Sequence, residues 1–285
     1  MNHPDSRTVP NICREIQRSL EAMVSFGRLT LTPEVRAHAD GCRGCWRAIV
    51  AARWAIADSS RDIEELRSFL GDDFEWGLDS SWRLTEDWHA VDRNSPDSIS
   101  AFYRETKWYV YNLVLWEASG QRPRYVEAAL PVLRRHRVRS VLDFGAGVGT
   151  DALRFCDLGL VVTASDFDNR ASRFLRWRAS LRRCPLTFVE SGTLATTSVS
   201  VDMVWALDVL EHLPRPIETL SVLLPAANLL VYDSEHVGQS SGRHPFHFQH
   251  NAARLEQAWN EQGFGRDTRC SSDSGLDVFA RVVCD

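Results

Sequence analysis

The sequence has no long apolar segment, and we expect no secretory leader. No apolar run among its 285 residues approaches the ~18 residues of a membrane-spanning helix. Residues 1–10 are polar and contain no signal-peptide core. We therefore expect a cytoplasmic protein that has no membrane partner.

A strong charge of either sign is also missing. The net charge is −5 at pH 7, and this composition argues against nucleic acid as a partner. Two arginine clusters, 134–139 and 173–183, lie on predicted helices or helix ends. We expect both clusters to be solvated faces.

The cysteines are not expected to form a disulfide framework. In a cytoplasmic chain, the seven cysteines are thiols or metal ligands. Four stand singly in or beside predicted core elements and are expected to be inert thiols: Cys156, Cys184, Cys270 and Cys284.

A glycine-rich turn is the most informative feature that is present. An apolar strand in Val141–Gly149 breaks into glycine at positions 145, 147 and 149, and a helix is expected over 151–158. Glycine removes the Cβ atoms that would keep a ligand away from the backbone. The first N–H groups of the helix point at the same place, so the pattern predicts a cofactor-binding turn.

The spacing narrows the choice of cofactor. Thr150 stands where the dinucleotide fingerprint has its third glycine, so an NAD-linked oxidoreductase is the weaker alternative. Asp166 ends a second strand, 160–165, at the roughly 20-residue spacing of a ribose-binding acid. Its carboxylate would repel a 2′-phosphate, which disfavours NADP.

Three motifs in this order resemble the Rossmann-like class I S-adenosylmethionine-dependent methyltransferases. The motifs are 141–149, 161–166 and 201–214, and the resemblance covers about 138–285. It implies an α/β fold with a seven-stranded sheet, helices on both faces and a terminal antiparallel hairpin of 264–269 and 276–283. It also implies methyl transfer from S-adenosylmethionine by direct displacement.

The resemblance further implies a set of cofactor-binding residues: Asp143, Gly145, Gly147, Gly149, Asp166, Phe167, Leu207 and Asp208. Asp166 would bind the ribose and Phe167 would pack on the adenine, while Leu207 and Asp208 would lie near the methyl group. The chain departs from the family after its third strand, 186–190. Ser191 and Gly192 stand there instead of the acid that contacts the adenine amine.

The N-terminal region contains the pattern C-x24-H-x3-C-x2-C, made by Cys13, His38, Cys42 and Cys45. Structural zinc takes four nitrogen or sulfur ligands. We expect His38 and Cys42 on one helix face with Cys45 on the next turn, and Cys13 on a preceding helix, 13–26. A redox-active dithiol and unrelated buried thiols are the alternatives.

This pattern resembles the zinc-containing anti-sigma factor domain over about 11–58. The resemblance implies zinc at the four residues and leaves open a protein partner bound by the surrounding helices. We favour a structural role, in which the module 1–58 is a helical cap that closes the substrate site. The apolar run 46–56 could equally pack on the methyltransferase domain.

The middle of the chain, 59–135, is an acidic, tryptophan-rich connector with a helix expected over 98–119. Tyr103, Trp108 and Tyr111 on this helix are candidates for the substrate pocket, with core packing as the alternative. The methyltransferase domain would then occupy 136–285.

A histidine-rich segment follows the fifth expected strand, 228–232. Ligands of an open α/β sheet bind beyond the carboxyl ends of the strands. His236, His244 and His247 are therefore candidates for a base or for orienting the substrate, with a metal site as the alternative. His212, one turn into the helix expected after the fourth strand, is predicted to be a structural hydrogen-bonding residue.

The leading functional hypothesis is methyl transfer to an unidentified small molecule. The methyl group is already activated and the leaving group is neutral, so the protein mainly aligns the acceptor and excludes water. The alternative is a zinc-dependent, anti-sigma-like regulator with a sensory or degenerate methyltransferase domain. The intact glycines and Asp166 favour the enzyme, and methylation of protein or RNA stays open.

Overall fold

The computed structural model describes residues 9–197, 199–234 and 245–282. Its contacts divide the chain into two compact units: residues 1–84 with 108–123, and residues 85–107 with 124–285. The three-part division expected from the sequence, with boundaries after residues 58 and 135, stays a prediction. Across the described residues, no helix is both long and apolar enough to cross a membrane.

The first unit is helical. Its elements are α1 (Val9–Phe26), α2 (Pro33–Gly41), α3 (Arg43–Ala57), α4 (Arg61–Leu70), the 3₁₀ turn η1 (Gly71–Asp73) and α7 (Tyr109–Ala118), while α5 (Ser80–Trp88) crosses the unit boundary. Trp54 of α3 lies at its core, with its ring packed against Phe74 and Tyr111. The Trp54 Nε1–H donates to the Leu78 carbonyl at 3.0 Å, so burying this indole leaves no unpaired donor.

The prediction of a single helix over 98–119 is wrong. Helix α6 (Pro96–Glu105) ends before Thr106, which is extended (φ −60°, ψ 131°) and whose N–H donates to the Phe102 carbonyl. Helix α7 begins three residues later, and the two helices belong to different units. Neither proline nor glycine stands at the break, so the usual sequence signal for a helix end is missing.

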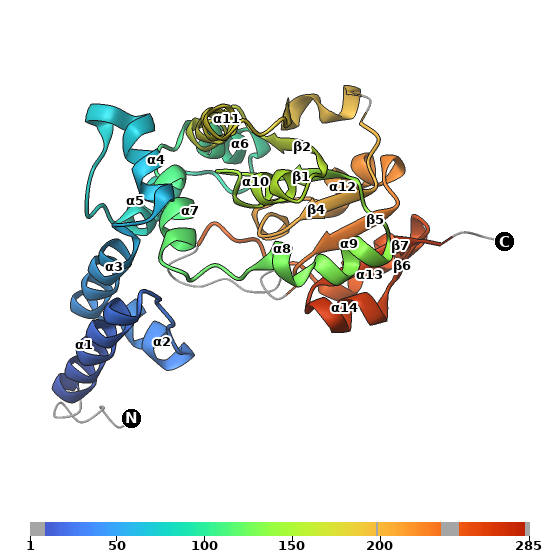
Figure 1. Cartoon of the computed structure of the whole chain (residues 1–285). Coiled ribbons are helices and arrows are strands. Elements are labelled where there is room, and N and C mark those ends of the chain that lie inside the picture. The colour runs from blue at the N-terminus through green and yellow to red at the C-terminus, as the bar shows by residue number, and fades with distance from the viewer. Residues whose placement is uncertain (1–8, 198, 235–244, 283–285) are drawn as a thin grey trace. The chain divides into compact units, whose positions relative to one another are not determined.

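The second unit is built on a seven-stranded sheet (Figure 1). Its strands are β1 (Ser140–Phe144), β2 (Val161–Asp166), β3 (Thr187–Glu190), β4 (Met203–Ala206), β5 (Leu229–Tyr232), β6 (Phe264–Arg266) and β7 (Asp277–Arg281). The order is β3-β2-β1-β4-β5-β7-β6, and β7 alone is antiparallel to its neighbours β5 and β6. The chain moves outward from β1 to β3 and returns to β4, so the strand order reverses between β1 and β4.

Helices connect these strands and cover the sheet. The helices of the second unit are α6, α8 (Tyr125–Ala128), α9 (Leu130–Arg135), α10 (Thr150–Asp157), α11 (Arg170–Arg182), α12 (Pro216–Leu223), α13 (Ala252–Glu261) and α14 (Thr268–Ser274). Three 3₁₀ turns accompany them: η2 (Ser191–Thr196), η3 (Leu210–His212) and η4 (Leu224–Ala226). Strands β6 and β7 pair antiparallel as expected, but the strand expected over 264–269 is too long: β6 ends at Arg266, and α14 begins at Thr268, where Asp267 caps its first turn.

Strand β4 shows how both faces of the sheet are buried. Alternate residues of a strand face opposite sides. Val204 and Ala206 share one core with residues of α12 and α13, whereas the Trp205 ring meets Phe155 of α10 at 5.1 Å. The Trp205 Nε1–H also donates to Asp151 of α10 at 2.8 Å. The sequence-based expectation of a seven-stranded sheet with helices on both faces is confirmed.

Cys156 and Cys184 form a disulfide, which corrects the expectation that both are separate thiols. Cys156 lies in the last turn of α10, and Cys184 follows α11. Successive right-handed crossovers from β1 to β2 and from β2 to β3 bring the two helices onto the same face of the sheet. Their carboxyl ends are therefore neighbours, with the two Cα atoms 6.0 Å apart.

Gly149, which precedes α10, is predicted to tolerate no side chain. Its φ is 78°, and a Cβ atom there would lie 2.0 Å from Cδ1 of the fully buried Leu175. We expect Gly149→Ala to lower the free energy of unfolding by about 2–4 kcal/mol, from left-handed strain and overpacking together. Chemical denaturation measures this loss.

Gly159→Ala is the matched control. Gly159 has a φ of 80°, but nothing lies within 4 Å of its added Cβ. This variant should lose only the left-handed strain, about 1–2 kcal/mol. Equal losses in the two variants would show that contact with Leu175 does not restrict position 149.

Candidate functional site

The predicted cofactor turn lies at the carboxyl end of β1, where the strand order reverses. Gly145, Gly147 and Gly149 all have positive φ angles, of 76°, 52° and 78°. The N–H groups of Gly145 and Ala146 both donate to the Ser165 carbonyl, at 2.8 and 3.0 Å. These bonds hold the turn against the end of β2, in the region where open α/β sheets bind ligands.

Packing also requires a glycine at position 145. A Cβ atom there would lie 2.5 Å from Cγ2 of Val209, a residue of the segment between β4 and η3. Part of the glycine pattern is therefore fixed by the chain itself, in addition to any approach by a ligand.

Asp166 is the acid at the end of β2, and its carboxylate faces the glycine turn. Its Oδ2 accepts the Gly147 N–H at 2.7 Å, and its Oδ1 accepts the Phe167 N–H at 2.7 Å and Nδ2 of Asn169 at 3.3 Å. Burial raises the pKa of Asp166 to about 6, against the lowering effect of these hydrogen bonds. The carboxylate is ionised above that pH and can accept further hydrogen bonds.

An aromatic and charged group surrounds Phe167, the residue predicted to pack on adenine. The Arg104 guanidinium lies 4.5 Å from the centroid of the Phe167 ring, and the Tyr103 ring stacks on it at 6.4 Å. Arg104 also pairs with Glu190 Oε1 at 2.7 Å. Glu190 precedes the position where the methyltransferases that the chain resembles have an adenine-binding acid. It is held beside Phe167 by Arg104, which belongs to no sequence motif.

One arginine of the second basic cluster is not solvated, which corrects the sequence-based expectation for the cluster. Arg178 is only 3% exposed, and its Nη1 donates to the Val148 carbonyl of the glycine turn at 3.0 Å. Arg173 and Arg176 of the same helix instead pair with Asp168 at the surface. Arg178 therefore supports the turn from the α11 side.

The residues after β4 bring two carboxylates together. Asp208 has a left-handed φ of 53°, which is uncommon for a residue with a side chain. Its Oδ1 accepts the Tyr125 hydroxyl at 3.2 Å, and the same hydroxyl lies 3.4 Å from Asp233 Oδ2 beyond β5. Leu207 and, in β1, Asp143 are both buried. Tyr125 lies outside the metal-ligand pattern and the three methyltransferase-like motifs, so no sequence motif selects it.

The structure groups His247 with two residues of η3. The His212 and His247 rings lie 4.7 Å apart and nearly perpendicular, and Glu211 Oε1 is 4.0 Å from His212 Nε2. His212 ends the three-residue 3₁₀ helix η3, so the helix expected at this point is short, and the following α-helix α12 begins only at Pro216. His236 and His244, the other predicted candidates, lie outside the described residues.

The three predicted substrate residues fall in different units. Tyr103 belongs to the second unit, and its hydroxyl lies 3.1 Å from His212 Nδ1. Trp108 and Tyr111 belong to the first unit, where Tyr111 is 1% exposed and donates its hydroxyl to the Asp73 carbonyl. A role in substrate binding stays a prediction for all three.

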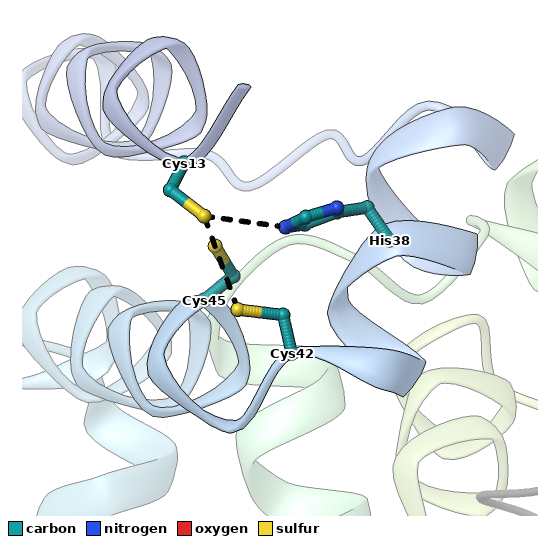
Figure 2. A group of neighbouring side chains, drawn as sticks. All are labelled: Cys13, His38, Cys42 and Cys45. Atoms are coloured by element: carbon teal, nitrogen blue, oxygen red, sulfur yellow. Dashed lines mark hydrogen bonds between the residues drawn. The ribbon is translucent and has the colours of Figure 1, made fainter. Parts of the chain in front are cut away.

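A second cluster lies within the first unit (Figure 2). Cys13 of α1 has its Sγ 3.5 Å from His38 Nε2 and 3.9 Å from Cys42 Sγ. With Cys45, each residue offers one ligand atom, and all four atoms lie within 4.8 Å of one another. Zinc–sulfur bonds of about 2.3 Å place tetrahedral sulfur ligands roughly 3.8 Å apart, so this arrangement fits a closed zinc site.

The expected single helix with His38, Cys42 and Cys45 is divided into two helices in the structure. Helix α2 ends at Gly41, Cys42 is extended (φ −121°, ψ 100°), and α3 begins at Arg43. The prediction of His38, Cys42 and Cys45 on one helix is therefore wrong. Hydrogen bonds from Cys45 lower the pKa of Cys42 to about 7, whereas burial and the neighbouring thiols raise the pKa of Cys45 to about 12.

The apolar run after these ligands lies mostly in the core of its own unit. Trp46, Ile49, Val50 and Trp54 are buried, and the Trp46 indole donates to Asp79 of the same unit at 2.7 Å. Side chains used in this way are not available as a binding surface for a protein partner.

No protein-family model matches the chain, and no curated protein matches it. Solved structures with a similar fold include the magnesium protoporphyrin IX methyltransferase ChlM from Synechocystis PCC 6803 with bound SAM. It is 17% identical, with a TM-score of 0.43, over 73% of this chain and 100% of that chain. LaPhzM is 16% identical, with a TM-score of 0.49, over 82% and 76% of the two chains. TehB from Haemophilus influenzae is 13% identical, with a TM-score of 0.43, over 59% and 66%.

The Arg178 contact gives a testable prediction for the stability of the glycine turn. Arg178→Met would keep much of the side-chain volume but leave the Val148 carbonyl without this donor. An unsatisfied buried acceptor costs about 1–3 kcal/mol, and we expect a loss of that size in the free energy of unfolding. Arg176→Met, on the same helix, removes an exposed ion pair with Asp168 and a contact of the guanidinium with the Phe188 ring, and should change stability by about 0–1 kcal/mol. Denaturation midpoints that fall equally in both variants would contradict a supporting role for Arg178.

Proposed function

We propose that the second unit is an S-adenosylmethionine-dependent methyltransferase that acts on a small molecule. The observation that carries this proposal is the contact of the Asp166 carboxylate with the Gly147 N–H. It joins a ribose-type acid at the end of β2 to a glycine turn at the end of β1, beside the point where the strand order reverses.

The chain's own residues fit the parts of this cofactor. Asp166 would accept hydrogen bonds from the ribose hydroxyls, and the Phe167 ring, backed by Arg104, would pack on the adenine. Asp143, with the three glycines, would hold the methionine part. Leu207 and Asp208 would line the side near the methyl group. When bound, S-adenosylmethionine supplies an activated methyl group on a positively charged sulfur.

The acceptor would be oriented by groups at the carboxyl ends of β4 and β5. Asp208 shares the Tyr125 hydroxyl with Asp233. His247 is the described candidate for orienting the acceptor or for a base, and metal binding by the same imidazole is the alternative role. The predicted roles of His236 and His244 belong to the same proposal, although both residues lie outside the described part of the chain.

For the first unit we propose a structural zinc ion at Cys13, His38, Cys42 and Cys45. Four protein ligands leave no open position, which is typical of structural rather than catalytic zinc. The ligands come from α1, α2, the α2–α3 junction and α3. The ion would therefore join three short helices around a small core.

Replacing Asp166 tests the cofactor site. We expect Asp166→Asn to weaken binding of S-adenosylmethionine about tenfold to hundredfold, because hydrogen bonds to a charged group contribute about 1.5–3 kcal/mol. Calorimetric titration at pH 7.5 measures this change. Asp168→Asn is the control: Asp168 pairs at the surface with Arg173 and Arg176, so its variant should bind S-adenosylmethionine normally.

The pKa of Asp166 also predicts how the affinity for S-adenosylmethionine depends on pH. Because the pKa of Asp166 is about 6, the carboxylate is protonated at lower pH and loses charge and acceptor capacity. Cofactor affinity of the unaltered protein should fall as the pH drops through about 6, and the Asp166→Asn variant should lack this step. An identical pH profile in the two proteins would show that Asp166 does not contact the cofactor.

Metal analysis tests the zinc proposal. We expect one equivalent of tightly bound zinc at this site in the purified protein, and loss of that equivalent when Cys42 and Cys45 both become serine. Cys270→Ser is the control, since Cys270 lies in the second unit beside His136. Retention of zinc by the Cys42/Cys45 variant, or its loss from the Cys270 variant, would contradict the four-ligand site.

A further inference from the structure

We infer that Glu211, His212 and His247 bind one divalent transition-metal ion that takes an oxygen atom of the methyl acceptor. The role of the ion toward the acceptor rests on the methyltransferase function proposed above. The metal site itself rests on the placement of the three side chains within the second unit.

The three ligand atoms converge on a small volume. One ligand atom from each residue lies within 4.8 Å of the other two, and Glu211 Oε1 is 4.0 Å from His212 Nε2. Ligands at about 2.1 Å from a metal ion lie roughly 3.4 Å apart in a tetrahedral site. A small rotation of the imidazole and carboxylate groups would therefore close the site around an ion.

His247 follows His212 by 35 residues in the sequence, and contacts with the surrounding chain hold it beside η3. The Phe248 N–H donates to the Glu211 carbonyl at 2.6 Å, which fixes the segment against η3. Arg93 Nη2 donates to the His247 carbonyl at 3.4 Å. Phe246, only 3% exposed, stacks on the His212 ring at 5.7 Å. These contacts pre-organise the ligands.

Tyr103 is a positioning residue for the site. Its hydroxyl lies 3.1 Å from Nδ1 of His212, so Nε2 is the nitrogen that faces Glu211. Histidine ligands usually bond their second nitrogen to a neighbouring group in this way, which fixes the orientation of the ring. Tyr103 also stacks on Phe167, which links the site to the proposed adenine contact.

The donor set indicates the kind of ion. Two imidazole nitrogens and one carboxylate oxygen suit manganese, iron, cobalt or zinc, and three protein ligands leave positions open for a further oxygen. The cluster of His136, Asp267 and Cys270 is less suited to a cation. There, Arg135 already lies 3.5 Å from the Asp267 carboxylate and supplies positive charge.

The ion would activate a hydroxyl acceptor. An oxygen bound to the metal releases its proton to water more readily, because the ion stabilises the negative charge. A lone pair of that oxygen forms the new bond to the methyl carbon. The carbon–sulfur bond breaks, and its electron pair stays on sulfur, which leaves as neutral S-adenosylhomocysteine.

Manganese binding tests the site directly. We would titrate the zinc-loaded full-length protein with Mn²⁺ and follow free Mn²⁺ by electron paramagnetic resonance. Mn²⁺ prefers oxygen and nitrogen ligands to thiolates, so the cluster at Cys13 should not compete. We expect one equivalent to bind, with affinity lowered about tenfold or more by His247→Ala and by Glu211→Gln.

Two further variants sharpen the test. Tyr103→Phe removes only the hydroxyl and should weaken Mn²⁺ binding about tenfold to hundredfold, as expected when a group that orients a ligand is lost. His89→Ala removes an exposed histidine of the same unit outside the cluster and should bind Mn²⁺ normally. Failure of the unaltered protein to bind about 1 mM Mn²⁺, or unchanged affinity in both His247→Ala and Glu211→Gln, would overturn the proposal.

Titration with S-adenosylmethionine separates this inference from the proposed function. Mn²⁺ binding without cofactor binding would contradict the methyltransferase while supporting the metal site. Cofactor binding without Mn²⁺ binding would contradict the metal site alone. If the unaltered protein binds both Mn²⁺ and S-adenosylmethionine, the single-site variants separate the two sites. Retention of Mn²⁺ by Asp166→Asn, together with retention of S-adenosylmethionine by His247→Ala, supports two distinct sites.

Discussion

The hydrogen bond from the Gly147 N–H to Asp166 holds together the part of the structure from which the proposed function follows. Strands β1 and β2 are parallel neighbours, with Phe144 in register with Ser165, so the residues that follow them meet at one edge of the sheet. The turn after β1 must curl back to reach the acid, which requires positive φ angles and therefore glycine. The N–H groups of Gly147 and Phe167 stabilise the ionised carboxylate of Asp166, whose neutral form burial alone would favour.

The two proposed metal sites differ in chemistry in a way that matches their roles. Three thiols and one imidazole in the first unit would complete a tetrahedron, so that ion could serve only to hold helices together. Two imidazoles and a carboxylate in the second unit would leave open positions, as a reacting oxygen requires. Because zinc prefers thiolate and Mn²⁺ prefers oxygen and nitrogen, the sites can be loaded and measured independently.

The sequence predicts the strands of the sheet well because apolar runs bounded by turn residues have few other interpretations. Strand β1 was expected from Val141 and runs over Ser140–Phe144; strand β3 was expected over 186–190 and runs over Thr187–Glu190. The break between α6 and α7 was missed because it has neither glycine nor proline. Helix propensity is a weak constraint, and packing within each unit overrides it at this point.

Residues distant in the chain were the hardest part of the site to predict. Arg104 and Tyr125 precede all three methyltransferase-like motifs, and only the folded chain brings them to Phe167 and Asp208. The histidine at position 247 was a candidate from its place after β5, but its grouping with η3 depends on the contact of Phe248 with Glu211. Such contacts depend on tertiary packing, which local periodicity does not encode.

Calorimetric titration of the unaltered full-length protein with S-adenosylmethionine is the decisive experiment for the proposed methyltransferase. We expect a single binding site per chain, with a dissociation constant between about 1 µM and 1 mM, the range of common Michaelis constants. Absence of binding at millimolar cofactor, in protein that is folded and carries its zinc, would contradict it.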